Sequence, residues 1–211
     1  MTALLATLFG TATLYTAVTS RLGAMVNVLA LQGFILFFIV LLRTPHLDGA
    51  TALFLLTETL LFKSVLIPRF LLKTIRLNEI HREVEPNIPH FHSLLLASGI
   101  LAMGFALAFW SSENVPGVLP IQYGIALSTI ATGLMTIITR RKIITHVMGY
   151  MIMQNGIFLL SLSISREMPL LVNLGILLDL FSCIFLLSLF FGKVKTTFGE
   201  ADTAHLETLR D

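Results

Sequence analysis

Apolar residues fall into seven long stretches that short polar segments separate. Crossing the hydrocarbon layer takes about 20 mostly apolar residues in a helix, and none of the seven stretches alternates as a barrel strand does. The pattern predicts an all-α, polytopic integral membrane protein with seven transmembrane helices in one domain, residues 1–191. The predicted spans are 2–20, 24–42, 49–72, 92–110, 119–139, 143–164 and 168–191.

Two polar stretches, 73–91 and 192–211, lie outside the predicted spans. Both are short and mixed in charge, so neither can bury a hydrophobic core of its own. Pro86 and Pro89 favour an irregular loop in the first stretch, and we expect the second to be a solvated tail. No part of the chain is large enough for a separate catalytic domain.

Composition narrows the class of protein further. Of 211 residues, 55% are hydrophobic and 12% are charged, whereas soluble domains are about 25% charged. The net charge of +2 provides no basic face for a nucleic-acid backbone. The single cysteine, Cys183, cannot alone hold an iron–sulfur cluster or a structural zinc ion. We therefore expect no cofactor in this chain, and any redox centres would belong to partner subunits.

Lys and Arg residues are distributed unequally between the two predicted membrane faces. Arg43 and Arg166 are placed at one face, Lys63 lies within a span, and the other eleven gather at the opposite face. Cytoplasmic loops carry the excess of Lys and Arg, so we predict an outside N-terminus, a cytoplasmic loop at 73–91 and a cytoplasmic tail at 192–211. The eleven are Arg21, Arg69, Lys73, Arg76, Arg82, Arg140, Arg141, Lys142, Lys193, Lys195 and Arg210.

Three ionisable side chains lie inside predicted spans: Glu58, Lys63 and Asp179. An ionisable group at the bilayer centre costs at least about 2.5 kcal/mol, so each is a functional hypothesis. The helical rise places Glu58 roughly 14 Å and Asp179 roughly 17 Å into their helices. Burial favours the protonated form of a carboxyl group, which makes Asp179 the candidate proton carrier. The alternative for Asp179 is a structural role.

Glu58 and Lys63 lie five residues apart in the span 49–72. In an α-helix that spacing turns their side chains about 140° apart, which is poor geometry for an intrahelical pair. We therefore predict that the two charges point to different neighbours. Pro68 cannot donate to the carbonyl of Ser64 and favours a kink there. The alternative is that the charges satisfy each other or another helix and only fix packing.

A polar stripe runs along the predicted helix 143–164. His146, Tyr150, Gln154, Ser161 and Ser165 follow spacings of four or seven residues, which place them on one helix face. The stripe has two open interpretations. It can line a hydrated proton path, or it can serve as interhelical hydrogen-bonding contacts.

Histidines near the membrane edge could ligate a haem, or they could bind a metal ion in the cytoplasmic loop. His92 and His146 begin predicted spans, and His90 lies two residues before His92. Haem ligation needs histidines deeper in the membrane, and Glu79 is the only nearby carboxylate with suitable spacing for a metal. We predict solvated histidines and no metal site.

Several short motifs occur in a recognisable order along the chain. Helix 49–72 contains Lys63-x-x-x-x-Pro68, and the predicted final helix contains Leu-Val-Asn-Leu-Gly-Ile-Leu-Leu-Asp over 171–179. Between them come Arg140-Arg141-Lys142, Gly149-Tyr150 and Asn155-Gly156. With these motifs the chain resembles the hydrogenase-4 component E family. Its last three predicted helices, 119–191, are also similar to the K subunit of respiratory complex I and to the MrpC component of Mrp-type antiporters.

The resemblance implies a non-redox membrane subunit of a group 4 [NiFe] hydrogenase-type, complex I-like assembly in a bacterial or archaeal cytoplasmic membrane. Such a subunit has no catalytic centre of its own. It joins an antiporter-like pumping subunit to the membrane anchor of the redox arm and contributes to proton or ion translocation, while the NiFe and Fe–S centres belong to partner subunits. The implied path residues are Asp179, Glu58, Lys63, Gln154, Tyr150 and His146.

One position departs from the family pattern. Family members usually carry a glutamate just before the Asn-Gly pair, where this chain has Gln154. A glutamine side chain hydrogen-bonds but does not gain or lose a proton at neutral pH. Two alternatives therefore stay open: a purely architectural membrane subunit, and a component of a multisubunit cation/proton antiporter.

Overall fold

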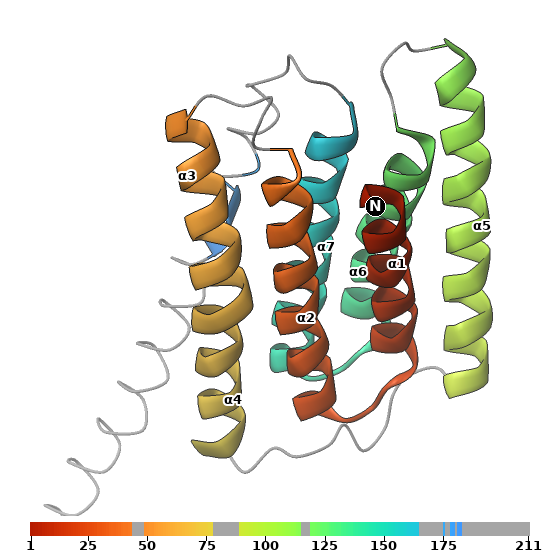
Figure 1. Cartoon of the computed structure of the whole chain (residues 1–211). Helices are drawn as coiled ribbons and strands as arrows, with labels where there is room; N and C mark the ends of the chain where they lie inside the picture. Colours follow the sequence, from red (N-terminus) through yellow and green to blue (C-terminus); the bar gives the residue numbers. More distant parts are fainter. Residues whose placement is uncertain are drawn as a thin grey trace, which may run out of the picture. The chain divides into compact units, whose positions relative to one another are not determined.

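The computed structural model describes residues 1–43, 49–77, 89–114, 119–164, 175, 178–179 and 181–182. The elements in this part of the chain are all helices (Figure 1). The chain divides into two compact units, Met1–Gly175 and Ile176–Asp211, and each is described by itself. Residues 78–88 of the predicted loop 73–91, most of the predicted seventh span and the tail 192–211 lie outside the described residues.

The first unit contains the helices that can be compared with the predicted spans. Within the described residues, α2, α5, α6 and α7 are long and apolar enough to cross a membrane. The all-helical class is thus confirmed, while the count of seven spans and their orientation stay predictions. The elements are α1 (Thr2–Val18), α2 (Leu22–Leu41), α3 (Gly49–Thr57), η2 (Glu58–Leu66), α4 (Ile67–Leu77), α5 (His90–Asn114), α6 (Pro120–Thr139) and α7 (Ile143–Ile164).

The segments α3, η2 and α4 form one uninterrupted helical run from Gly49 to Leu77. Its middle, η2, is a π-helix, in which each backbone N–H bonds to the carbonyl five residues earlier. At its end the N–H of Ile67 bonds to the carbonyl of Phe62. Pro68 follows directly, and its ring would crowd the carbonyl four residues earlier in an α-helix. The wider π register ahead of Pro68 fits that requirement, and the run continues five residues past the predicted boundary at 72.

Small residues bring the helices of the first unit close together. A Cβ atom on Gly133 of α6 would lie 2.7 Å from the carbonyl oxygen of Gly149 on α7. A Cβ on Gly156 would lie 2.9 Å from the side chain of Ile130 on α6. Close backbone approach at small residues is a common packing mode of membrane helices. Figure 1 shows α2 between α1 and the run α3–η2–α4, and α2 contacts both.

Burial in the first unit differs from that of a soluble domain. Large apolar side chains face outward, with Phe91 71% and Trp110 70% exposed on α5, while polar side chains such as Thr13, Gln32 and Asn155 are buried. Soluble monomers rarely expose extensive apolar surface. This arrangement suits a helix bundle whose outer surface contacts lipid.

Arg140, one of the eleven basic residues that the sequence places at one membrane face, is buried. Its side chain is 4% exposed, and its Nη2 donates to the carbonyls of Ala17 (3.2 Å) and Thr19 (3.0 Å). These carbonyls end α1, where the helix leaves acceptors unsatisfied and favours a cation. A ring nitrogen of His146 lies 2.7 Å from the carbonyl oxygen of Arg140. Arg140 therefore ties the end of α1 to the α6–α7 connection.

Candidate functional site

The buried charges Glu58 and Lys63 lie next to each other. Lys63 Nζ is 3.9 Å from Glu58 Oε1, and the side chains are 5% and 9% exposed for Lys63 and Glu58. The prediction that they point to different neighbours is wrong. It assumed α-helical geometry, whereas both residues belong to η2, and a π-helix aligns positions five residues apart.

Lys63 also contacts a neighbouring helix. Its Nζ lies 4.3 Å from the ring centroid of Phe158 on α7, and Phe158 is 2% exposed. An ammonium over an aromatic face is attracted by the negative face of the ring, and more strongly where water is excluded. Gln154 precedes Phe158 by four residues and so shares its face of α7. The predicted path residue Gln154, itself buried, thus lies one turn from the ring under Lys63.

Gly33 of α2 allows the backbone of η2 to approach at the position of Lys63. A Cβ atom on Gly33 would lie 2.8 Å from the carbonyl carbon of Lys63 and 2.9 Å from the nitrogen of Ser64. Both are backbone atoms, which cannot rotate away as a side chain can. In contrast, a Cβ on Gly23 of the same helix would meet nothing within 4 Å. Gly33 is therefore required for this helix contact.

A chain of hydrogen bonds between buried side chains joins four helices of the first unit. Gln32 on α2 donates from Nε2 to Thr13 Oγ1 on α1 at 3.0 Å. Its Oε1 accepts from Asn155 Nδ2 on α7 at 3.2 Å. The hydroxyls of Thr13 and Thr129, the latter on α6, are 3.2 Å apart. This polar chain, Thr129–Thr13–Gln32–Asn155, is a feature that reasoning from the sequence missed.

A signal for the polar chain was present in the sequence. Gln32 interrupts an otherwise apolar stretch of α2, and the rule that made Glu58 a candidate applies to any strongly polar group in a span. Asn155 lies in the Asn155-Gly156 motif of the same chain. The two threonines carried no signal, because threonines in membrane helices commonly bond to their own backbone, as Thr129 does to Ile125.

One turn of α2 connects the charge pair to the polar chain. Successive helix residues point about 100° apart, so Gln32 is directed to α1 and α7 while Gly33 packs on η2. Amides and hydroxyls both donate and accept hydrogen bonds. The site therefore combines a buried ion pair with a chain of amides and hydroxyls. Such groups can relay protons through hydrogen bonds, and they can equally hold the helices together.

The other predicted path residues are described by their burial and contacts within their own unit. Tyr150 and His146 on α7 are half-buried, and His146 is engaged with the Arg140 carbonyl. Ser161 is buried, whereas Ser165 lies outside the described residues. Asp179 is a half-buried helical residue of the second unit. Its role as the protonatable group stays a prediction.

Comparisons with known proteins give distant similarities. The chain is 27% identical over 191 residues to the uncharacterized protein Rv0085 of Mycobacterium tuberculosis, covering 90% of this chain and 87% of that protein. It is also 27% identical over 154 residues to hydrogenase-4 component E of Escherichia coli K12, covering 70% and 71% of the two chains. The same values hold for hydrogenase-4 component E of Shigella flexneri. No family model matches, and no solved structure matches with significance.

Proposed function

We propose that this chain is a non-redox membrane subunit of a complex I-like, hydrogenase-type assembly. Its distant similarity to hydrogenase-4 component E and its helices that are apolar enough to cross a membrane support this proposal. In it, the chain joins an antiporter-like pumping subunit to the membrane anchor of the redox arm. The NiFe and Fe–S centres belong to partner subunits, and the membrane is the cytoplasmic membrane of a bacterium or archaeon.

The buried pair of Glu58 and Lys63 is the main observation that supports a role in ion translocation. Two charges removed from water are costly unless they interact well with each other and with their surroundings. A separation of 3.9 Å is a loose ion pair, and in the same position the Lys63 ammonium also lies over the Phe158 ring. The pair can therefore respond to a charge that arrives nearby, because electrostatic interactions are strong where the dielectric constant is low.

The proposed path uses further groups on α7 and in the second unit. Gln154 orients water on the face of α7 that carries Phe158, since its amide can donate and accept without ionising. Tyr150 and His146 extend the stripe by one turn each toward the start of α7. Asp179 is the protonatable group that exchanges the proton with an adjacent subunit.

The assembly is tested by isolating the chain with its native partners. The full chain is tagged in its own membrane, solubilised in mild detergent and captured, and the co-purifying subunits are identified by mass spectrometry. The proposal expects subunits with nickel-site and iron–sulfur motifs together with antiporter-like subunits. A complete antiporter set with no redox subunit would overturn it.

Proton translocation is tested separately in inverted membrane vesicles with a pH-sensitive dye. The double variant Glu58→Gln/Lys63→Met, which removes both charges of the buried pair, and the single variant Asp179→Asn are each expected to lower pumping at least about tenfold, while assembly and redox turnover persist. Lys142→Met, which removes a cation at the α6–α7 connection, serves as the matched control and is expected to pump normally. Unchanged pumping in both variants, with the assembly intact, would instead favour the architectural alternative.

A further inference from the structure

The outer surface of the helical run changes sharply from apolar to cationic near its end. In η2 the side chains of Leu61, Phe62 and Leu66 are 51%, 40% and 50% exposed. Three residues after Leu66 the exposed residues become Arg69, Lys73 and Arg76 on α4. An exposed apolar surface matches lipid tails and exposed cations match the headgroup layer. The change matches that of a helix that passes from the hydrocarbon into the headgroup layer.

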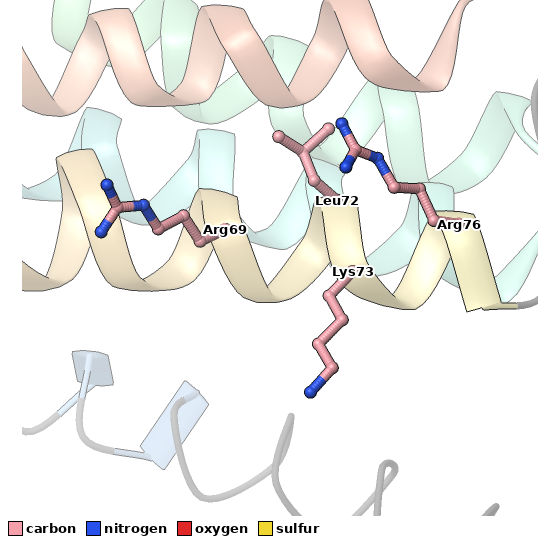
Figure 2. Close-up of a pocket in the computed structure, with 4 residues that line it drawn as sticks. All are labelled: Arg69, Leu72, Lys73 and Arg76. Atoms are coloured by element: carbon pink, nitrogen blue, oxygen red, sulfur yellow. The ribbon is translucent and has the colours of Figure 1, made fainter.

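The three cations share one face of α4 and line one hollow. Their spacings of four and three residues place them on one helix face, while Leu71 and Ile75 are buried on the other side. Together with Leu72 they line a hollow of about 460 Å³. α4 contains no acidic residue. Figure 2 shows the charged ends of Arg69, Lys73 and Arg76 spread along the helix and pointing apart.

We propose that this face of α4 binds the phosphate headgroup of an anionic phospholipid. Basic groups just beyond a membrane-spanning segment attract anionic lipid, by about 1 kcal/mol per Lys or Arg. The spread of the three charged ends suits the broad headgroup of a lipid better than a single small anion held at one point. Leu72 in the hollow and the exposed Phe62 and Leu66 earlier in the run provide apolar surface for the acyl chains.

This inference rests on membrane location alone, so it stands or falls separately from proton translocation. It also assigns a role to cations that neither the charge pair nor the polar chain uses. A partner protein with an acidic surface is the competing occupant. The observation that favours lipid is the direct succession of exposed apolar and exposed cationic side chains along one helical run.

The test measures lipid retained by the purified full-length chain. The protein in detergent is titrated with phosphatidylglycerol or with phosphatidylcholine, and native mass spectrometry counts bound lipid. The triple variant Arg69→Gln/Lys73→Gln/Arg76→Gln is compared with Arg21→Gln/Arg141→Gln/Lys142→Gln, which removes the same charge from residues outside α4. Gel filtration checks that both variants remain monodisperse, and the single variant Lys73→Gln is the reserve should the triple variant aggregate.

The expected result is preferential binding of phosphatidylglycerol by the wild-type chain, weakened at least about tenfold in the α4 variant and little changed in the control variant. For Lys73→Gln alone the expected loss is about fivefold. Three results would overturn the proposal: equal retention of both lipids, equal loss in both triple variants, or no loss in the α4 variant. Displacement of the lipid by millimolar inorganic phosphate would also overturn it and assign the face to a free anion.

Discussion

The ammonium of Lys63 lies 3.9 Å from the carboxylate of Glu58, five residues earlier in the same helical run. An α-helix would turn these side chains away from each other, so the contact depends on the π-helical register of η2. The backbone geometry of one segment therefore decides whether two buried charges are paired.

Breaking this pair on one side is expected to destabilise the protein strongly. Lys63→Met leaves the Glu58 carboxylate buried without its counter-charge, and removing one partner of a buried pair costs about 3–5 kcal/mol. The double variant Glu58→Gln/Lys63→Met is expected to be more stable than Lys63→Met, because no unpaired charge remains. Reversible unfolding in detergent or bicelles measures the free energies. Equal costs for the single and double variants would contradict a direct pairing.

Gly33→Ala is expected to destabilise the contact between α2 and η2. The added methyl group would lie 2.8 Å from a backbone carbon of Lys63, and overpacking of this kind costs about 1–3 kcal/mol. Gly23→Ala on the same helix is the matched control, because its methyl group meets nothing within 4 Å. It should be neutral or stabilising by up to about 1 kcal/mol. The unfolding temperatures of the two variants provide the measurement. Equal unfolding temperatures would contradict the close contact between Gly33 and η2.

Gln32→Leu is expected to disrupt the polar chain among four helices. It removes the acceptor of Asn155 and a donor to Thr13, and a buried donor left unsatisfied costs about 1–3 kcal/mol. Adding Asn155→Leu should recover part of the loss, because the orphaned amide is then gone. Thr11→Val is the control and should change stability little, because the exposed Thr11 hydroxyl bonds to the carbonyl of Leu8 within α1. A strictly additive double variant would argue against the coupling.

Arg140→Gln is expected to loosen the end of α1. The substitution removes charge-assisted hydrogen bonds to the carbonyls of Ala17 and Thr19, each of a type that contributes about 1.5–3 kcal/mol. Arg141→Gln removes the same charge from the neighbouring exposed residue and should stay within about 0.5 kcal/mol of the wild type. Hydrogen exchange of the last turn of α1 provides a local measurement. Equal exchange rates in the two variants would refute the capping role.

Hydrophobic patterning was sufficient for the coarse fold. Long apolar stretches predicted helices, and the bounds of α2, α6 and α7 lie within two residues of the predicted spans. The reason is physical: backbone groups in lipid must be satisfied within their own segment, so a long apolar stretch has little choice but to be helical. The candidate charges Glu58 and Lys63 were likewise visible, because an ionisable residue in an apolar stretch is conspicuous in the sequence itself.

The relations among these residues came only from the tertiary structure. Whether a segment winds as an α-helix or a π-helix depends on its packing and on Pro68 downstream, and that choice paired Glu58 with Lys63. The partners of Gln32 lie on α1 and α7, and no periodicity within α2 specifies which helix packs beside it. The sequence by itself thus determined helical segments in a membrane and the candidate charges. Interhelical packing decided which polar groups meet, because that depends on distances between residues far apart in the chain.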